Sequence, residues 1–265
     1  MSSPRLLQGT VERVAPWLVP IAILILWEAG ARSGFIEART LPAPSQVAVA
    51  FWESAKSGEL GRNVLISFER AMIGLAIGGG LGFLLGILTG VSRHAELLLD
   101  SGLQMLRNVP HLAIIPMVIL WFGIDETAKI FLVAVGTLFP IYLNTYHGIR
   151  TIDRGLIEMA EVNGLGKFAI FWRVLLPGAM PSVLVGLRYA LGIMWLTLIV
   201  AETISASSGI GYMTMNAREF LQTDVVVLGI LVYALLGKAA DSATKLIEHR
   251  VLAWHPAYHD RAAAN

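Results

Sequence analysis

The segment from Ala71 to Ser92 contains no charged side chain and is the longest uncharged run in the sequence. As a helix, a segment of this length crosses the roughly 30 Å hydrocarbon core of a bilayer, which a helix in a soluble core seldom needs to do. The whole chain agrees with a membrane location, because 55% of its 265 residues are hydrophobic and 15% are charged. Soluble domains carry about a quarter charged residues. The sequence therefore predicts a transmembrane helix here.

Five other apolar stretches are interrupted by few ionisable side chains and are long enough to be further transmembrane helices. The first of them is not followed by a clear cleavage pattern, so we expect a retained helix rather than a signal peptide. Pro110 and Pro116 predict a kink or break at the start of the third. The sequence thus predicts an all-α integral membrane protein with one transmembrane domain over residues 1–265 and six spans, over 15–32, 66–92, 103–123, 128–147, 181–203 and 224–245.

Several kinds of function are excluded by what the sequence lacks. The absence of cysteine excludes disulfides, thiolate metal sites and cysteine nucleophiles, and a formal charge of +1 offers no basic surface for nucleic acid. No segment matches the G-x-x-x-x-G-K-[ST] phosphate loop, and no His, Asp and Glu residues have metal-ligand spacing. We therefore expect no catalytic residue, no metal ligand and no bound cofactor in this chain.

The distribution of Lys and Arg among the loops predicts the orientation. With the amino terminus in the cytoplasm, eleven of these residues lie on the cytoplasmic side and six on the other side. Since cytoplasmic loops carry the excess of positive charge, both termini are expected inside the cell. The polar segment 149–180, between the fourth and fifth spans, is then cytoplasmic as well.

Glycines recur every fourth residue through the second span. This spacing places them on one helical face and predicts close packing against a neighbouring helix, since small residues let two backbones approach in a membrane. A moving contact in a transport cycle is the alternative. The five glycines of the stripe are Gly74, Gly78, Gly82, Gly86 and Gly90.

The segment 149–180 predicts two short helices. Asp153 is suited to cap the first, and Asn163-Gly164 supplies a left-handed stop after it. The second is expected over Lys167–Leu176, ending before Pro177. Its aromatic surface, formed by Phe168, Phe171 and Trp172, suits either a helix lying on the membrane surface or a projection inserted into a groove of a partner protein.

At this segment the sequence resembles binding-protein-dependent ABC importer permeases. Glu158-Met159-Ala160, then Gly164, then Val174-Leu-Leu-Pro177 reproduce the spacing of the EAA loop of that family, with Met159 and Val174 as mild departures. The resemblance implies the type I importer permease fold, with this loop forming cytoplasmic coupling helices that dock into a cleft of a separate ATPase subunit, which carries ATP and Mg²⁺. It implies coupling roles for Glu158, Met159, Ala160, Gly164, Phe168, Leu176 and Pro177.

The resemblance extends over nearly the whole chain and is greatest to permeases of aliphatic sulfonate importers. Met105–Pro116, Trp121–Glu126 and Met194–Thr203 carry it, although permeases for taurine, nitrate and pyrimidine precursors share parts of these segments. It implies a homodimer in the bacterial inner membrane, served by an ATPase dimer and a periplasmic sulfonate-binding protein. A secondary transporter without an ATPase, or a membrane-embedded enzyme, remains the rival interpretation.

Polar side chains inside spans are candidates for the solute path, because placing them in lipid is costly. Glu202 would repel a sulfonate, so we expect it to form a gate or a hydrogen bond at a helix end. Neutral donors suit the path better, although ordinary contacts between helices are the alternative for each of them. The candidates of this kind are Asn144, Tyr146, Trp195 and Thr197.

Overall fold

The computed structural model describes residues 4–254, apart from the side chains of residues 4–14, 16, 17 and 205. This part of the chain contains helices and no strand. The ends of the chain, assigned above to the cytoplasm, fall outside the described residues. The helices are α1 (Pro4–Arg32), α2 (Pro44–Lys56), α3 (Glu59–Val91), α4 (Arg93–Arg107), α5 (Ile115–Phe122), α6 (Glu126–Arg150), α7 (Arg154–Val162), α8 (Lys167–Ile170), the π-helical turn η1 (Phe171–Leu175), α9 (Leu176–Ser205), α10 (Ile210–Glu219) and α11 (Thr223–Val251).

Within the described residues, four helical segments are long and apolar enough to cross a membrane. They are α3, α6, the continuous helix Lys167–Ile204 that includes α9, and α11. They contain the predicted spans 66–92, 128–147, 181–203 and 224–245, apart from Ser92 just after α3, and so confirm a chain built from membrane helices. The predicted span 15–32 lies in α1, where the side chains of residues 16 and 17 are outside the described part.

The predicted span 103–123 is divided between two helices, α4 and α5. Helix α4 ends at Arg107, and the eight-residue helix α5 begins only at Ile115. Pro110 lies in the connection, where it cannot donate a backbone hydrogen bond, and Pro116 stands at the start of α5, where that missing donor is tolerated. The break expected from these two prolines therefore separates two helices instead of bending one.

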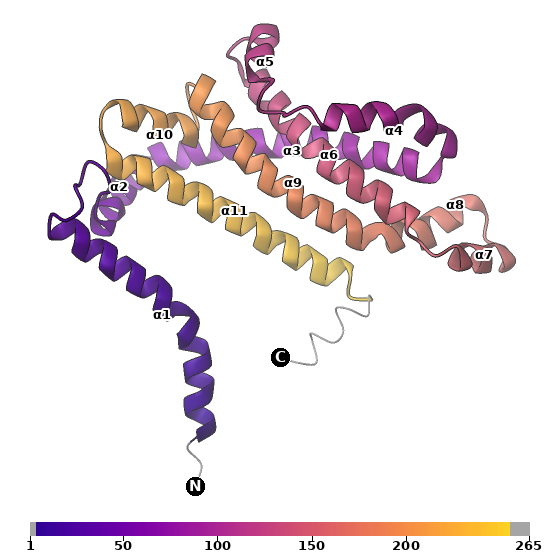
Figure 1. Cartoon of the computed structure of the whole chain (residues 1–265), viewed down its shortest axis with the longest axis horizontal. Coiled ribbons are helices and arrows are strands. Elements are labelled where there is room, and N and C mark those ends of the chain that lie inside the picture. The colour runs from indigo at the N-terminus through magenta and orange to yellow at the C-terminus, as the bar shows by residue number, and fades with distance from the viewer. Residues whose placement is uncertain (1–3, 255–265) are drawn as a thin grey trace.

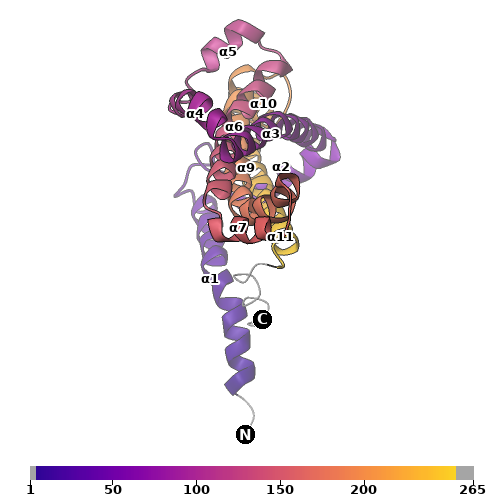
Figure 2. The same ribbon diagram turned by 90° about the vertical axis from the view of Figure 1, so that its right-hand side faces the viewer.

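The long helices lie side by side along the longest axis of the molecule (Figure 1). Helices α7 and α8 lie at one end of this bundle and helices α2 and α10 at the other, which we call the α7 end and the α10 end. Helix α1 extends away from the bundle, as the perpendicular view also shows (Figure 2). The bundle therefore presents two separate ends, each built from short helices.

The closest packing in the bundle is between α3 and α6. All five glycines of the stripe are buried, and a side chain at any of them would meet atoms of α6. At Gly78 it would collide with the backbone carbonyl of Ala134, and at Gly86 it would meet the side chain of Thr145. The structure thus places the glycine stripe in a contact between two helix backbones, as small residues allow in a membrane.

Helices α9 and α11 are joined by charged side chains toward the α7 end. Arg188 on α9 lies 2.6 Å from Glu248 and 3.6 Å from Asp241 on α11. Asp241 also pairs with Lys238 and Lys245 of its own helix, at 3.7 and 2.9 Å. The two pairs of Arg188 join the carboxyl-terminal half of α11 to α9.

Candidate functional site

Helix α7 carries the first part of the predicted coupling segment. Asp153 caps its amino terminus, since Asp153 Oδ1 accepts a 2.8 Å hydrogen bond from the backbone N–H of Gly155. Ala160 faces inward and is buried, whereas Glu158 is exposed and Met159 is 58% exposed. The helix thus buries the small residue Ala160 and leaves Glu158 and Met159 exposed.

A left-handed residue ends α7, as the Asn163-Gly164 pair predicts. Gly164 has a φ of +81°, a conformation in which a side chain would be strained. The N–H of Leu165 donates to the carbonyl of Ala160 at 3.1 Å, and the N–H of Gly164 donates to that of Glu161 at 2.9 Å. These bonds satisfy the last carbonyls of the helix and turn the chain toward α8.

The predicted end of the second short helix at Leu176 is wrong, because the helix continues into α9. Pro177 cannot donate to the carbonyl four residues before it, and the turn ahead of it is π-helical. Here the N–H of Leu176 donates to the carbonyl of Phe171, five residues earlier. The aromatic segment Phe168–Trp172 is therefore continuous with the long membrane helix α9.

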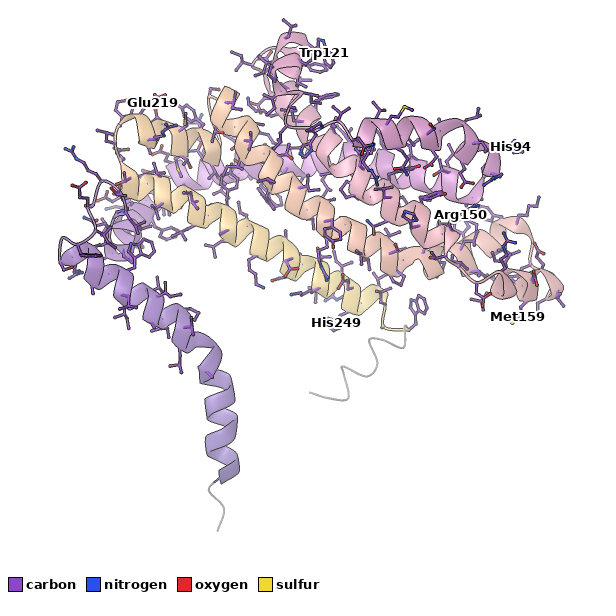
Figure 3. All side chains as sticks on the ribbon, viewed as in Figure 1. His94, Trp121, Arg150, Met159, Glu219 and His249 are labelled. Atoms are coloured by element: carbon purple, nitrogen blue, oxygen red, sulfur yellow. The ribbon has the colours of Figure 1, made fainter. Side chains whose placement is uncertain are left out.

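The coupling segment presents a large apolar surface. Phe168 is 77% exposed, Val162 is 87% exposed, and the rings of Phe168 and Trp172 pack edge to face with centroids 6.2 Å apart. A hollow of about 770 Å³ lies between α7 and the start of α9, and Met159, Leu165 and Pro177 are among its lining residues. Figure 3 shows Met159 at the α7 end and Glu219 at the opposite end. A surface of this kind is typical of a site that contacts another protein or a membrane.

A buried charge cluster lies at the α10 end, centred on Glu202. Its carboxylate accepts hydrogen bonds from the Ser67 hydroxyl at 2.8 Å, the Arg70 guanidinium at 2.7 Å and the Tyr233 hydroxyl at 2.9 Å. The backbone N–H of Gly211 adds a fourth at 2.9 Å. Glu202 therefore joins α3, α9, α10 and α11 through hydrogen bonds. The bond from Gly211, near the start of α10, is a hydrogen bond at a helix end, one of the two roles expected for Glu202 from the sequence.

Arg70 extends the cluster toward α6. Its Nε and Nη2 atoms donate to the two carboxylate oxygens of Glu126, and Nη1 and Nη2 also donate to the carbonyl and hydroxyl oxygens of Ser208. Lys129 lies 3.3 Å from Glu126. The sequence analysis did not identify Ser67, Arg70, Glu126 or Lys129 as site residues. Arg70 could have been found, because it is a charged residue inside the predicted span 66–92, and such residues are candidates for a functional site.

The four neutral path candidates do not converge on one site. Asn144 donates to the carbonyl of Pro140 at 2.8 Å, and Tyr146 donates to Glu96 at 2.6 Å. Thr197 is fully buried with its hydroxyl 3.0 Å from His111 Nε2, and the ring of Trp195 faces Tyr233. Within one chain these side chains face different neighbours.

Helix α4 is joined to α6 through Glu96. The hydrogen bond from Tyr146 lowers the pKa of Glu96, and desolvation opposes that shift. Arg93 and Arg150, at 3.0 and 3.4 Å from the carboxylate, lower it further. The carboxylate therefore stays charged in this polar contact.

Among residues 4–254, no three His, Asp or Glu side chains form a group that could hold a metal ion.

Comparison with known proteins places residues 78–253 in a family described as binding-protein-dependent transport system inner membrane component. The aliphatic sulfonates transport permease protein SsuC of Escherichia coli strain K12 is 62% identical over 251 residues, 95% of each chain. Its namesake in Bacillus subtilis strain 168 is 46% identical over 91% of this chain and 87% of its own. The taurine transport system permease protein TauC of E. coli is 34% identical over 88% of this chain and 86% of its own.

Two solved structures share the fold. A chain of an amino acid ABC transporter gives a TM-score of 0.60 at 16% identity, covering 71% of this chain and 92% of its own. A chain of the MetNI methionine ABC transporter gives 0.52 at 20% identity, covering 75% and 97%. Together with the membrane helices and the EAA spacing, these likenesses lead to one assignment. The chain belongs to the binding-protein-dependent ABC transporter permeases, the integral membrane components of these transport systems.

Proposed function

We propose that this chain is the membrane subunit of an ATP-driven importer that moves aliphatic sulfonates across the bacterial inner membrane for sulfur acquisition. The observation that carries the substrate is the 62% identity, over 95% of both chains, to a permease named for aliphatic sulfonates. The taurine permease shares 34%, so taurine, nitrate or another small oxyanion is the second candidate.

The segment 149–180 is the proposed coupling element, docked into a groove of a separate ATPase subunit that binds ATP and Mg²⁺. Its exposed apolar side chains and its continuity with α9 support this role. Movement of the ATPase pair would then be transmitted through α7 and η1 to the membrane helices. The residues proposed to carry the contact are Glu158, Met159, Ala160, Gly164, Phe168, Leu176 and Pro177.

Two copies of the chain are proposed to enclose the solute path, with six spans in each and both termini in the cytoplasm. Helix α1 and the α4–α5 pair would supply the two crossings beyond the four apolar helices. In this arrangement the α7 end faces the cytoplasm and the α10 end faces the periplasm. A periplasmic binding protein would deliver the sulfonate there, and the alternation between inward-facing and outward-facing states would follow the ATPase cycle.

Asn144, Tyr146, Trp195, Thr197 and Glu202 are proposed to contribute to the path or its gate. Support comes from Trp195, whose buried Nε1 has no hydrogen-bond partner in the described part of the chain and would gain one if the helices opened toward an oxyanion. Glu202 would act through the helices that its hydrogen bonds connect.

Growth tests this proposal. Cells lacking the chain should fail to grow on ethanesulfonate as sole sulfur source while growing normally on sulfate, and the intact chain should restore growth. Glu158→Lys should fail to restore growth although the protein reaches the membrane, and an ATPase should copurify with the intact chain. Restored growth by Glu158→Lys, or transport without an ATPase, would favour the secondary transporter.

A further inference from the structure

We propose that Arg70 and Lys129 form an anion-binding site at the α10 end, which Glu126 occupies as a tethered competitor and which the sulfonate group of the solute takes in its place. The identity of the ligand rests on the proposed function. The anion site itself rests on the geometry of the charge cluster.

The three side chains differ sharply in exposure. Arg70 and Lys129 are 3% and 2% exposed at their side chains, whereas the Glu126 side chain is 54% exposed. Two buried cations therefore face a carboxylate that solvent reaches. An anion that replaces Glu126 would contact both cations.

Arg70 is held in place independently of Glu126. Its Nη1 donates to Glu202 Oε1 and to the carbonyl of Ser208, both at 2.7 Å. Only the Nε and Nη2 edge of the guanidinium points at Glu126, in the paired arrangement that carboxylates, sulfonates and phosphates accept. The guanidinium thus remains aligned for an oxyanion when Glu126 moves away.

The charge balance favours an anion at this position. With Glu126 in place, Arg70 and Lys129 are balanced by Glu126 and Glu202. Without it, two buried cations face the single carboxylate of Glu202, whose oxygens already accept four hydrogen bonds. The Lys129 ammonium then keeps only the carbonyl of Ile124, at 3.4 Å, among its described partners. A singly charged oxyanion restores neutrality.

A polar hollow adjoins the cluster. It has a volume of about 450 Å³, within the range of small-molecule sites, and Asn63, Arg62 and Glu59 are among its lining residues. Ser208 also lines it, and the Ser208 hydroxyl accepts a 2.9 Å bond from Arg70 Nη2. The hollow is therefore separated from the guanidinium by one serine.

The tethered carboxylate gives the site a property suited to transport. A solute has to displace Glu126, so its affinity is reduced by the competition, and Glu126 can return when the solute moves on. Removing the carboxylate should therefore raise the affinity for anions, while removing Lys129 should lower it. An ion-pair cluster that only stabilises the fold predicts no saturable binding of ethanesulfonate to the native chain, because Glu126 then keeps its place.

Anion binding to the full chain in phosphatidylcholine nanodiscs tests the site. The unfolding midpoint is followed against sodium ethanesulfonate, with sodium chloride at equal ionic strength and neutral ethanesulfonamide as references. We expect Glu126→Gln to bind ethanesulfonate about tenfold more tightly than the native chain. Lys129→Met added to Glu126→Gln should reverse the gain, and Glu219→Gln, an exposed carboxylate on α10, should behave as the native chain. Equal affinities of Glu126→Gln and the native chain would overturn the proposal.

A second measurement avoids the replacement of buried Lys129 and changes only the exposed residue Glu126. The chain has no cysteine, so Glu126→Cys introduces a single thiol. This thiol should react several times faster with the anionic reagent 2-sulfonatoethyl methanethiosulfonate than with its trimethylammonium counterpart, relative to Glu219→Cys. An equal ratio at both positions would contradict the anion site. Both measurements work without transport, so a failed growth test with intact anion binding would remove the sulfonate assignment alone.

Discussion

Arg70 Nη1 and Glu202 Oε1 lie 2.7 Å apart, and the two side chains are 3% and 0% exposed. The remaining acceptor positions of the carboxylate are filled by Ser67, Tyr233 and the N–H of Gly211. A charge buried in this way is stable only while its partners remain, because desolvation costs several kcal/mol for each ion. This ion pair therefore links α3 to α9 where the membrane bundle meets α10.

Replacement of Arg70 should destabilise the protein strongly. Arg70→Met leaves Glu202 charged and buried without a cation, which costs about 3–5 kcal/mol. The expected result is a clear fall in the unfolding midpoint of the purified chain, followed by size-exclusion chromatography after heating. Adding Glu202→Gln to Arg70→Met should recover part of the loss, because the uncompensated charge is gone. Equal stability of Arg70→Met and the native chain would show that the pair contributes little.

A large side chain at Gly78 should disrupt the bundle. Its Cβ would collide with the carbonyl of Ala134 on α6, a backbone atom that cannot rotate away. We expect Gly78→Leu to cost roughly 3 kcal/mol or more, at the upper end for overpacking, and to lower the yield of folded protein. Gly80 lies two residues along the same helix, where a Cβ meets nothing within 4 Å. Gly80→Leu should fold normally, and equal yields of both variants would contradict the α3–α6 contact.

The left-handed turn after α7 should be needed for coupling. Gly164→Ala places a side chain at a φ of +81°, at a cost of about 1–2 kcal/mol. This strain should shift α7 relative to α8 and reduce sulfonate uptake without preventing insertion. Gly166→Ala is the matched control, since Gly166 has a φ of −72° and an open surrounding. Uptake that falls equally in both variants would argue against a special role of the turn.

The contact between α4 and α6 should weaken in acid. The pKa of Glu96 is lowered from 4.5, first by the hydrogen bond from Tyr146, so its stabilising effect is present above that value. It is lost as the pH falls through the lower pKa of the folded state. The unfolding midpoint should therefore fall as the pH falls from 5 to 3, and Tyr146→Phe should reduce this dependence. A Tyr146→Phe profile identical to the native one would show that Glu96 is held by other groups.

Much of the fold follows from periodicity and composition in the sequence. The uncharged run before Arg93 and the four-residue glycine spacing predict a membrane helix packed on one face, and the structure has α3 packed there against α6. Asp153 and Gly164 predict both ends of α7, because caps and left-handed stops are local features. The helix end predicted before Pro177 is wrong, because a π-helical turn ahead of the proline lets the helix continue without the missing backbone donor.

The charge cluster could not be predicted in the same way. Arg70 and Glu202 are 132 residues apart in the chain, and neither the register of α3 against α9 nor the position of Glu126 at the start of α6 is encoded in a local pattern. The neighbours of the path candidates could not be predicted for a similar reason, because the type of a side chain does not specify which residue it contacts.

Accessibility of a single cysteine at the α7 end tests the central claim most directly. Met159→Cys in the cysteine-free chain should be labelled in intact cells only by a membrane-permeant maleimide, and binding of the ATPase should protect it. Glu219→Cys, at the opposite end (Figure 3), should be labelled from outside by an impermeant maleimide. Labelling of Met159→Cys from outside by the impermeant reagent would contradict the account, because no cytoplasmic ATPase could then contact the segment.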